Sequence, residues 1–136
     1  MGKWNSIIVP FDKTKNIARK VLIDHRGEPL DLCTGLVQLK NVICVLKKDF
    51  DSVAVLVSNM KTHYEIDSSS RVIKEYSPLE VFPFKASKGD KKVIAIENPV
   101  LINFCELSEF QFQLMDLDKK KISDIEISVH MYYQFC

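Results

Sequence analysis

The fold is decided by the stretch IEISVHMYYQF, residues 125–135. Its odd positions are all apolar or aromatic: Ile125, Ile127, Val129, Met131, Tyr133 and Phe135. Its even positions are mostly polar: Glu126, Ser128, His130, Tyr132 and Gln134. A side-chain period of two is typical of a β-strand with one buried face. We therefore predict a strand over residues 125–135 whose odd side chains face a core.

The segment FQFQL, residues 110–114, alternates in the same way. A polar segment, Asp116-Leu117-Asp118-Lys119-Lys120-Lys121, lies between the two strands. Two alternating segments joined by a polar loop are typical of a hairpin. We predict that residues 110–135 form a long antiparallel hairpin, which makes the protein all-β.

Residues 35–48 allow two interpretations. Their leucine and isoleucine side chains have helical spacing at Leu36, Leu39, Ile43 and Leu46. Residues 41–46, however, form a β-rich apolar run, and a charged segment separates them from a second such run at 52–58. We favour two strands paired as a hairpin, and a helix over 35–48 remains the alternative.

The middle of the chain continues the pattern of short strands and turns. Residues 61–66 and 71–76 flank the loop 67–70, whose short polar side chains suit a turn. Pro78 and Pro83 predict an edge strand or an irregular segment. Residues 88–90, Lys-Gly-Asp, predict a tight turn. The whole chain, residues 1–136, is predicted to be a single antiparallel β-sandwich of about nine or ten strands, jelly-roll-like or with another Greek-key topology.

The composition is that of an ordinary globular protein. Hydrophobic residues make up 46% of the chain and charged residues 27%, and the formal net charge is +1. This balance does not favour nucleic acid as a partner. No apolar run approaches the roughly 20 residues that span a bilayer. No signal peptide is evident, which predicts synthesis in the cytoplasm.

The sequence contains four cysteines: Cys33, Cys44, Cys105 and Cys136. They form no Cys-x-x-Cys pair, so no zinc site of that type is predicted. We favour buried, reduced thiols, with Cys136 as a possible exposed one, and two disulfides remain the alternative.

No catalytic, cofactor-binding or metal-binding residue is predicted. The three histidines, His25, His63 and His130, show no ligand spacing. The Asp-x-Asp pairs at 49–51 and 116–118 suit turn chemistry, and calcium binding is the alternative. The lysine clusters at 47–48, 91–92 and 119–121 suit solubility and protection of strand edges.

The even face of residues 125–135 is the candidate interface, carried by His130, Tyr132 and Gln134. Tyrosine is enriched at protein interfaces. We expect the strand 125–135 to be a sheet edge or a subunit contact.

Residues 109–129, with the aromatic strand EFQFQLM, the Asp-rich turn and the residues Ile122, Ile125, Ile127 and Val129, resemble the C-terminal hairpins of small virion proteins of viruses and virus-like mobile elements. The resemblance implies a non-enzymatic particle or appendage subunit that assembles with itself, often as a trimer. The sequence thus predicts a structural or assembly protein, plausible as a virion capsid or appendage subunit, that acts through homo-oligomeric contacts or binds other structural proteins. The alternative is an intracellular β-sandwich module that binds a protein or peptide.

Overall fold

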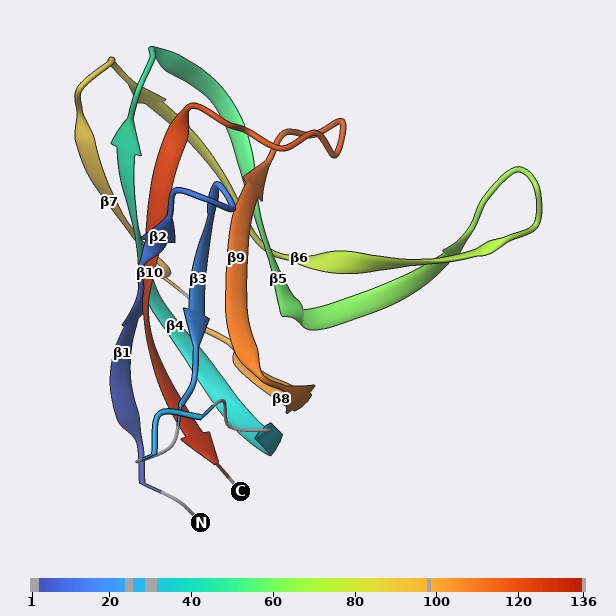
Figure 1. Cartoon of the computed structure of the whole chain (residues 1–136). Helices are drawn as coiled ribbons and strands as arrows, with labels where there is room; N and C mark the ends of the chain where they lie inside the picture. Colours follow the sequence, from blue (N-terminus) through green and yellow to red (C-terminus); the bar gives the residue numbers. More distant parts are fainter. Residues whose placement is uncertain (1–2, 24–25, 29–31, 98, 136) are drawn as a thin grey trace.

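A computed structural model describes residues 3–23, 26–28, 32–97 and 99–135, with backbone only for residues 32, 33, 106 and 135 (Figure 1). Those residues contain ten strands and no helix. The strands form two antiparallel sheets, which confirms the predicted all-β sandwich. The jelly-roll connectivity and the single-domain organisation stay predictions. In the described residues, no helix has the length and hydrophobicity that crossing a membrane requires.

The first sheet is built around the two long strands β10 (Ile125–Phe135) and β4 (Leu32–Leu46). Its order is β1-β10-β4-β7, and β8 also pairs with β4; the remaining strands are β1 (Asn5–Val9), β7 (Lys91–Ala95) and β8 (Leu101–Leu107). The strand β10 therefore lies between β1 and β4. Our expectation that β10 is a sheet edge is wrong.

The second sheet has the order β2-β3-β9-β5-β6. Its strands are β2 (Phe11–Asp12), β3 (Ile17–Val21), β9 (Glu109–Met115), β5 (Phe50–Ile66) and β6 (Val72–Ala86). The strand β6 lies at an edge and contains Pro78 and Pro83, as predicted. An edge strand tolerates proline because one side of it needs no hydrogen-bond donors.

The core lies between the sheets, and both sheets fill it with alternate side chains. From β10 it receives Ile125, Ile127, Val129 and Met131, and from β9 it receives Phe110, Phe112 and Leu114. The centre of the Tyr133 ring lies 6.0 Å from that of Phe110 in the other sheet, so Tyr133 also faces the interior of the sandwich. The predicted odd core face is confirmed from Ile125 to Tyr133, and the side chain of Phe135 lies outside the described residues.

The two predicted hairpins that involve β9–β10 and β4–β5 are wrong. The strand β9 pairs with β3 and β5, and β10 pairs with β1 and β4. The strands β4 and β5 likewise belong to different sheets. Packed sheets lie about 10 Å apart, and a few extended residues can bridge this gap. A short connection can therefore cross from one sheet to the other instead of joining two paired strands. Alternation reveals the buried face of a strand, and it carries no information about the strand beside it.

Residues 35–46 are strand, as we favoured, and a β-bulge interrupts their alternation. The register of β4 on β10 shifts at one point, where His130 pairs with Asn41 and Met131 pairs with Leu39. The skipped residue, Lys40, moves the buried positions from odd to even numbers. The buried residues of this stretch are accordingly Val37, Leu39, Val42, Cys44 and Leu46. Of the four residues at helical spacing, Leu39 and Leu46 are buried, and Leu36 and Ile43 are partly exposed on the other face of the strand.

Cys44 and Cys105 are both free thiols, in opposite environments. Cys44 is buried in the core, and this burial raises the pKa of its thiol to about 12. Cys105 is exposed, which corrects the prediction that it is buried. The side chains of Cys33 and Cys136 lie outside the described residues.

This contrast predicts selective alkylation. Because the thiolate is the nucleophile, iodoacetamide at neutral pH should modify Cys105 quickly and Cys44 only after unfolding. Peptide mass spectrometry of native and urea-treated protein would measure both rates. Equal labelling of the two residues in native protein would contradict the burial of Cys44.

Candidate functional site

The β5–β6 hairpin extends beyond the sandwich as a two-stranded arm (Figure 1). We define the arm as residues 62–76, in which β5 pairs with β6 from Thr62↔Tyr76 to Ile66↔Val72. The pairing of β5 with β9 ends at Ser58, so the described part of the arm has no third strand. The arm is therefore a ribbon that the rest of the second sheet does not support.

Irregular pairing just before the arm directs it away from the sheet. The β5–β6 register shifts next to Val57 and again between Val57 and Thr62. In this interval, the side chain of Asn59 donates to the carbonyl oxygen of Glu109 at 2.9 Å and accepts from the amide of Gln111 at 3.0 Å. Asn59 thus fixes the start of β9 to the base of the arm. Irregular pairing of this kind bends a strand.

The tip of the arm is the predicted polar turn. The carboxylate of Asp67 accepts hydrogen bonds from the amides of Ser69 and Arg71, both at 2.9 Å. These bonds and the ion pair with Arg71 keep the pKa of Asp67 below its usual value, with the Arg71 amide as the largest cause. The turn is thereby closed by its own side chains.

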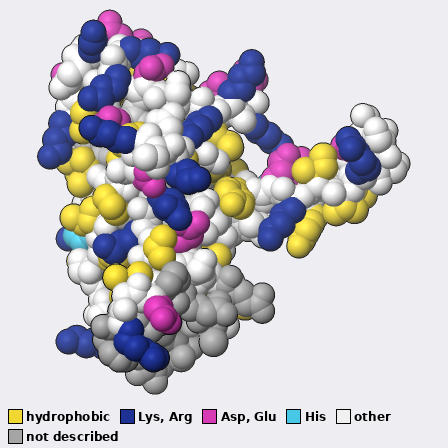
Figure 2. All heavy atoms as spheres, in the orientation of Figure 1, with side chains coloured by type: hydrophobic (Ala, Val, Ile, Leu, Met, Phe, Trp, Pro, Cys, Tyr) yellow, Lys and Arg dark blue, Asp and Glu magenta, His cyan; other side chains and the backbone are white. Residues whose placement is uncertain are grey.

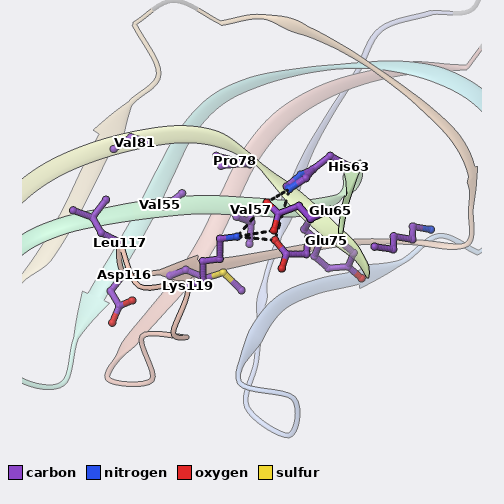
Figure 3. Close-up of a pocket in the computed structure, with 13 residues that line it drawn as sticks. Val55, Val57, His63, Glu65, Glu75, Pro78, Val81, Asp116, Leu117 and Lys119 are labelled. Carbon is purple, nitrogen blue, oxygen red and sulfur yellow. Dashed lines mark hydrogen bonds and ion pairs between the residues drawn. The ribbon is translucent and has the colours of Figure 1, made fainter. Parts of the chain in front are cut away.

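One face of the arm base carries a charged cluster that we call the arm-base cluster: His63, Glu65, Glu75 and Lys119 (Figure 3). His63 lies directly opposite Glu75 in the ribbon, and Glu65 follows two residues after His63, on the same face. His63 Nε2 lies 3.0 Å from Glu65 Oε1 and 3.6 Å from Glu75 Oε2. The strand register, and not sequence proximity, brings these groups together.

Lys119 reaches the cluster from the segment that connects β9 to β10. Its ammonium Nζ donates to Glu75 Oε2 at 2.9 Å and to Glu65 Oε2 at 3.2 Å. The carboxylates of Glu75 and then Glu65 raise the pKa of Lys119. The hydrogen bond from His63, followed by that from Lys119, lowers the pKa of Glu65. Since all of these groups are partly exposed, solvent screens their attraction, and each pair contributes little stability.

A groove with a volume of about 830 Å³ lies beside the cluster (Figure 3). Its apolar part is formed by Val55, Val57, Pro78, Val81, Met115 and Leu117, and Tyr76 also borders it. Val55 and Val57 are buried, yet they do not belong to the main core, because they lie on the other face of the second sheet. We call this feature the arm groove. It joins an apolar floor to the charged groups of the arm base.

The opposite face of the arm is largely apolar. Tyr64 is 68% exposed, Ile66 73%, Val72 68% and Tyr76 39%. Residues 62, 64 and 66 of β5 lie on one face of the ribbon, because side chains of a strand alternate. Ile66 pairs with Val72 and Thr62 pairs with Tyr76, so Val72 and Tyr76 lie on that face too. We call Tyr64, Ile66, Val72 and Tyr76 the apolar arm face. Figure 2 shows hydrophobic side chains gathered along the lower side of the arm.

A serine, a histidine and a carboxylate are hydrogen-bonded in series at the arm base. Ser77 Oγ lies 2.8 Å from His63 Nδ1, and His63 Nε2 contacts Glu65. Ser77 is only 7% exposed and is not among the residues that line the groove. Neither Cys44 nor Cys105 lines the groove.

The predicted interface residues lie elsewhere, on the outer face of the first sheet. His130 Nε2 lies 2.8 Å from Ser6 Oγ, and Lys40 Nζ lies 5.7 Å from the centre of the Tyr132 ring. His130 and Tyr132 are partly exposed and neighbouring, as predicted. Gln134 is only 6% exposed, so it offers little surface to a partner. Alternation placed it on the polar face correctly but did not reveal that this end of the face is covered.

The other polar motifs behave as ordinary structure. Asp116 Oδ1 accepts from the amides of Asp118 and Lys120, as predicted for turn chemistry. Asp49 accepts from the amide of Lys88 beside the turn at 88–90. Lys48 forms a 2.8 Å ion pair with Asp124, near the strand ends that lysines were predicted to protect.

The sequence contains part of the signal for the arm-base cluster. A hairpin closed by the predicted loop 67–70 pairs residues whose numbers sum to 137, which sets His63 against Lys74. The observed pairs sum to 138, as in Ile66↔Val72, and set His63 against Glu75. The spacing His63-x-Glu65 places a carboxylate on the same face as His63. The position of Lys119 in the cluster results from a contact between segments far apart in the sequence, so no local pattern predicts it.

Searches of protein-family models and of curated proteins find no match for this chain.

Proposed function

We propose that this is a non-enzymatic assembly protein that associates with further copies of itself through the apolar arm face. The observation that carries the proposal is the exposure of Tyr64, Ile66 and Val72 on a ribbon that stands apart from the sandwich. A two-stranded ribbon is marginally stable alone in water, and it gains stability when its apolar face is covered. Contiguous exposed apolar side chains typically mark an interaction surface.

Self-association suits the shape of this surface. Two arms laid antiparallel about a two-fold axis present the same face to each other, which makes a closed, isologous contact. The two tyrosines bring large, rigid contact area, as is typical of interfaces. Lys74, opposite Tyr64 on this face, can extend its ammonium into water while its methylene groups cover apolar surface.

As a finer proposal, the protein is a virion capsid or appendage subunit. The resemblance of residues 109–129 to small virion proteins and the sandwich fold with its projecting arm support this class. The alternative is a module that binds a protein or peptide by strand addition. It is favoured by the edge of β5 beyond Ser58, where β9 no longer pairs.

The test is the molar mass in solution of the wild type and of the triple variant Tyr64→Ser, Ile66→Ser, Val72→Ser. We expect an oligomer at micromolar concentration for the wild type. The variant should associate at least about a hundredfold more weakly, because an interface anchor contributes about 2 kcal/mol and 1.4 kcal/mol is a factor of ten. Light scattering coupled to size exclusion measures both.

Two control variants separate this surface from others. Val93→Ser removes an equally exposed apolar side chain from β7 and should leave the molar mass unchanged. Tyr132→Ala tests the predicted interface on β10, and a selective loss of association there would move the interface to that face. A wild type that stays monomeric at tens of micromolar would refute self-association.

A further inference from the structure

We propose that His63, Glu65 and Glu75 form a binding site for a divalent transition-metal ion, and we take Zn²⁺ as the representative ion. Each residue directs one ligand atom into the same space, and the three atoms lie within 4.8 Å of one another (Figure 3). An imidazole nitrogen with two carboxylate oxygens is a donor set that zinc accepts in proteins. This inference concerns the face opposite the apolar arm face and does not depend on self-association.

The distances are already close to those of a coordinated ion. Zinc bonds to nitrogen and oxygen ligands are about 2.0–2.2 Å long, so neighbouring ligands of a tetrahedral ion lie about 3.3–3.5 Å apart. The imidazole nitrogen of His63 lies 3.0 Å from one carboxylate and 3.6 Å from the other. Small side-chain rotations, which partly exposed groups make freely, complete the set. The fourth position then opens toward the arm groove.

The backbone holds the three ligands in place. His63 and Glu75 are directly opposed in the antiparallel ladder, and the pair Glu65↔Ile73 follows on the same side of the ribbon. In such a ladder, directly opposed side chains have Cβ atoms about 5 Å apart, which suits ligands that meet at one ion. Assembly of the site thus requires no folding beyond that of the arm.

Ser77 provides an independent indication, because it orients the imidazole. Its hydroxyl lies 2.8 Å from His63 Nδ1 and is itself buried at the root of the arm. Histidines that bind metals usually donate their other ring N–H to a fixed acceptor, which aims the free nitrogen at the ion. In the ion-bound site, Nδ1–H would donate to Ser77 Oγ, and Nε2, which donates to Glu65 in the ion-free protein, would give its lone pair to the ion.

Lys119 marks the position of the cation. Its ammonium lies between Glu75 and Glu65, at 2.9 Å and 3.2 Å from their oxygens, and it balances their charge. A bound divalent ion would take over this role and displace the ammonium into water, since two cations repel at such a distance. Lys119 is therefore a competitor for the site, and binding would release the 116–124 segment from the arm.

The experiment is calorimetric titration of the 136-residue chain with ZnCl₂ under reducing conditions. A Cys105→Ser background removes the exposed thiol as a rival ligand. We expect His63→Ala and Glu75→Gln each to weaken binding by more than about a hundredfold. Ser77→Ala should weaken it by about tenfold, the lower end of the effect of removing a group that orients a ligand. Lys119→Met should strengthen binding by about tenfold.

His130→Ala is the matched control, because it removes a histidine from the first sheet and should leave zinc affinity unchanged. Circular dichroism confirms that each variant is folded. Binding that survives His63→Ala and Glu75→Gln, a wild type that takes up no zinc below millimolar concentration, or a Lys119→Met variant that binds more weakly would each overturn the proposal. Molar mass, measured separately, keeps this result apart from the test of self-association.

Discussion

Replacing Val129 with aspartate is expected to unfold the protein. Val129 lies in the central strand β10, where it pairs with Val9 on one side and Val42 on the other, and all three side chains are fully buried. A carboxylate at this position has no cation or donor within the core. The cost of burying an unpaired ion is several kcal/mol, and small domains have only about 5–15 kcal/mol of stability.

Urea denaturation followed by circular dichroism measures this effect. Ser128→Asp is the matched control, since it places the same charge one residue earlier on the outer face of β10. We expect that control to cost about 1 kcal/mol or less, as surface substitutions do. If both variants were equally stable, the assignment of the odd face to the core would be wrong.

The second large effect is expected at Gly35, which lies in β4 where three strands approach closely. A Cβ atom on this residue would lie 2.4 Å from Cζ of Phe104 and 2.6 Å from the carbonyl oxygen of Gln134. The ring of Phe104 can shift slightly, but the carbonyl belongs to the neighbouring strand and is fixed by the sheet. Gly35→Ala should therefore cost about 1–3 kcal/mol, as overpacking of a core does.

Thermal unfolding compares Gly35→Ala with Thr34→Ala, an exposed neighbour that should change stability little. The double variant Gly35→Ala, Phe104→Leu removes the closest atom and should recover part of the loss. A full recovery would show that the ring alone is responsible, and no recovery would assign the effect to the backbone of β10. An unchanged melting temperature for Gly35→Ala would contradict the close packing itself.

The sequence predicted burial well and strand pairing poorly. The odd positions of β10 and the aromatic positions of β9 were identified because one buried face imposes a period of two. The partners of these strands were misassigned because pairing depends on the whole sheet, and a connection such as 116–124 fits a hairpin or a crossing between sheets. At Lys40, a bulge shifted the buried positions of β4 from odd to even numbers, which no pattern in the sequence indicated.

The candidate site was missed for a related reason. His63, Glu65 and Glu75 become neighbours only through the register of the arm, and Lys119 only through the path of the 116–124 segment. The sequence predicted that residues 61–66 and 71–76 flank a loop, and their alternation is that of any half-buried strand. Only the position of the arm outside the sandwich shows that Ile66 and Val72 are exposed.

The central position of β10 has a consequence for how the protein is made. The neighbours of β10, β1 and β4, are synthesised early, and until residues 125–135 leave the ribosome they have no strand between them. The first sheet therefore cannot close before translation has passed residue 135, and the inner edges of β1 and β4 stay open meanwhile. Open edges attract other strands, so this is the interval in which the nascent chain most needs protection from aggregation.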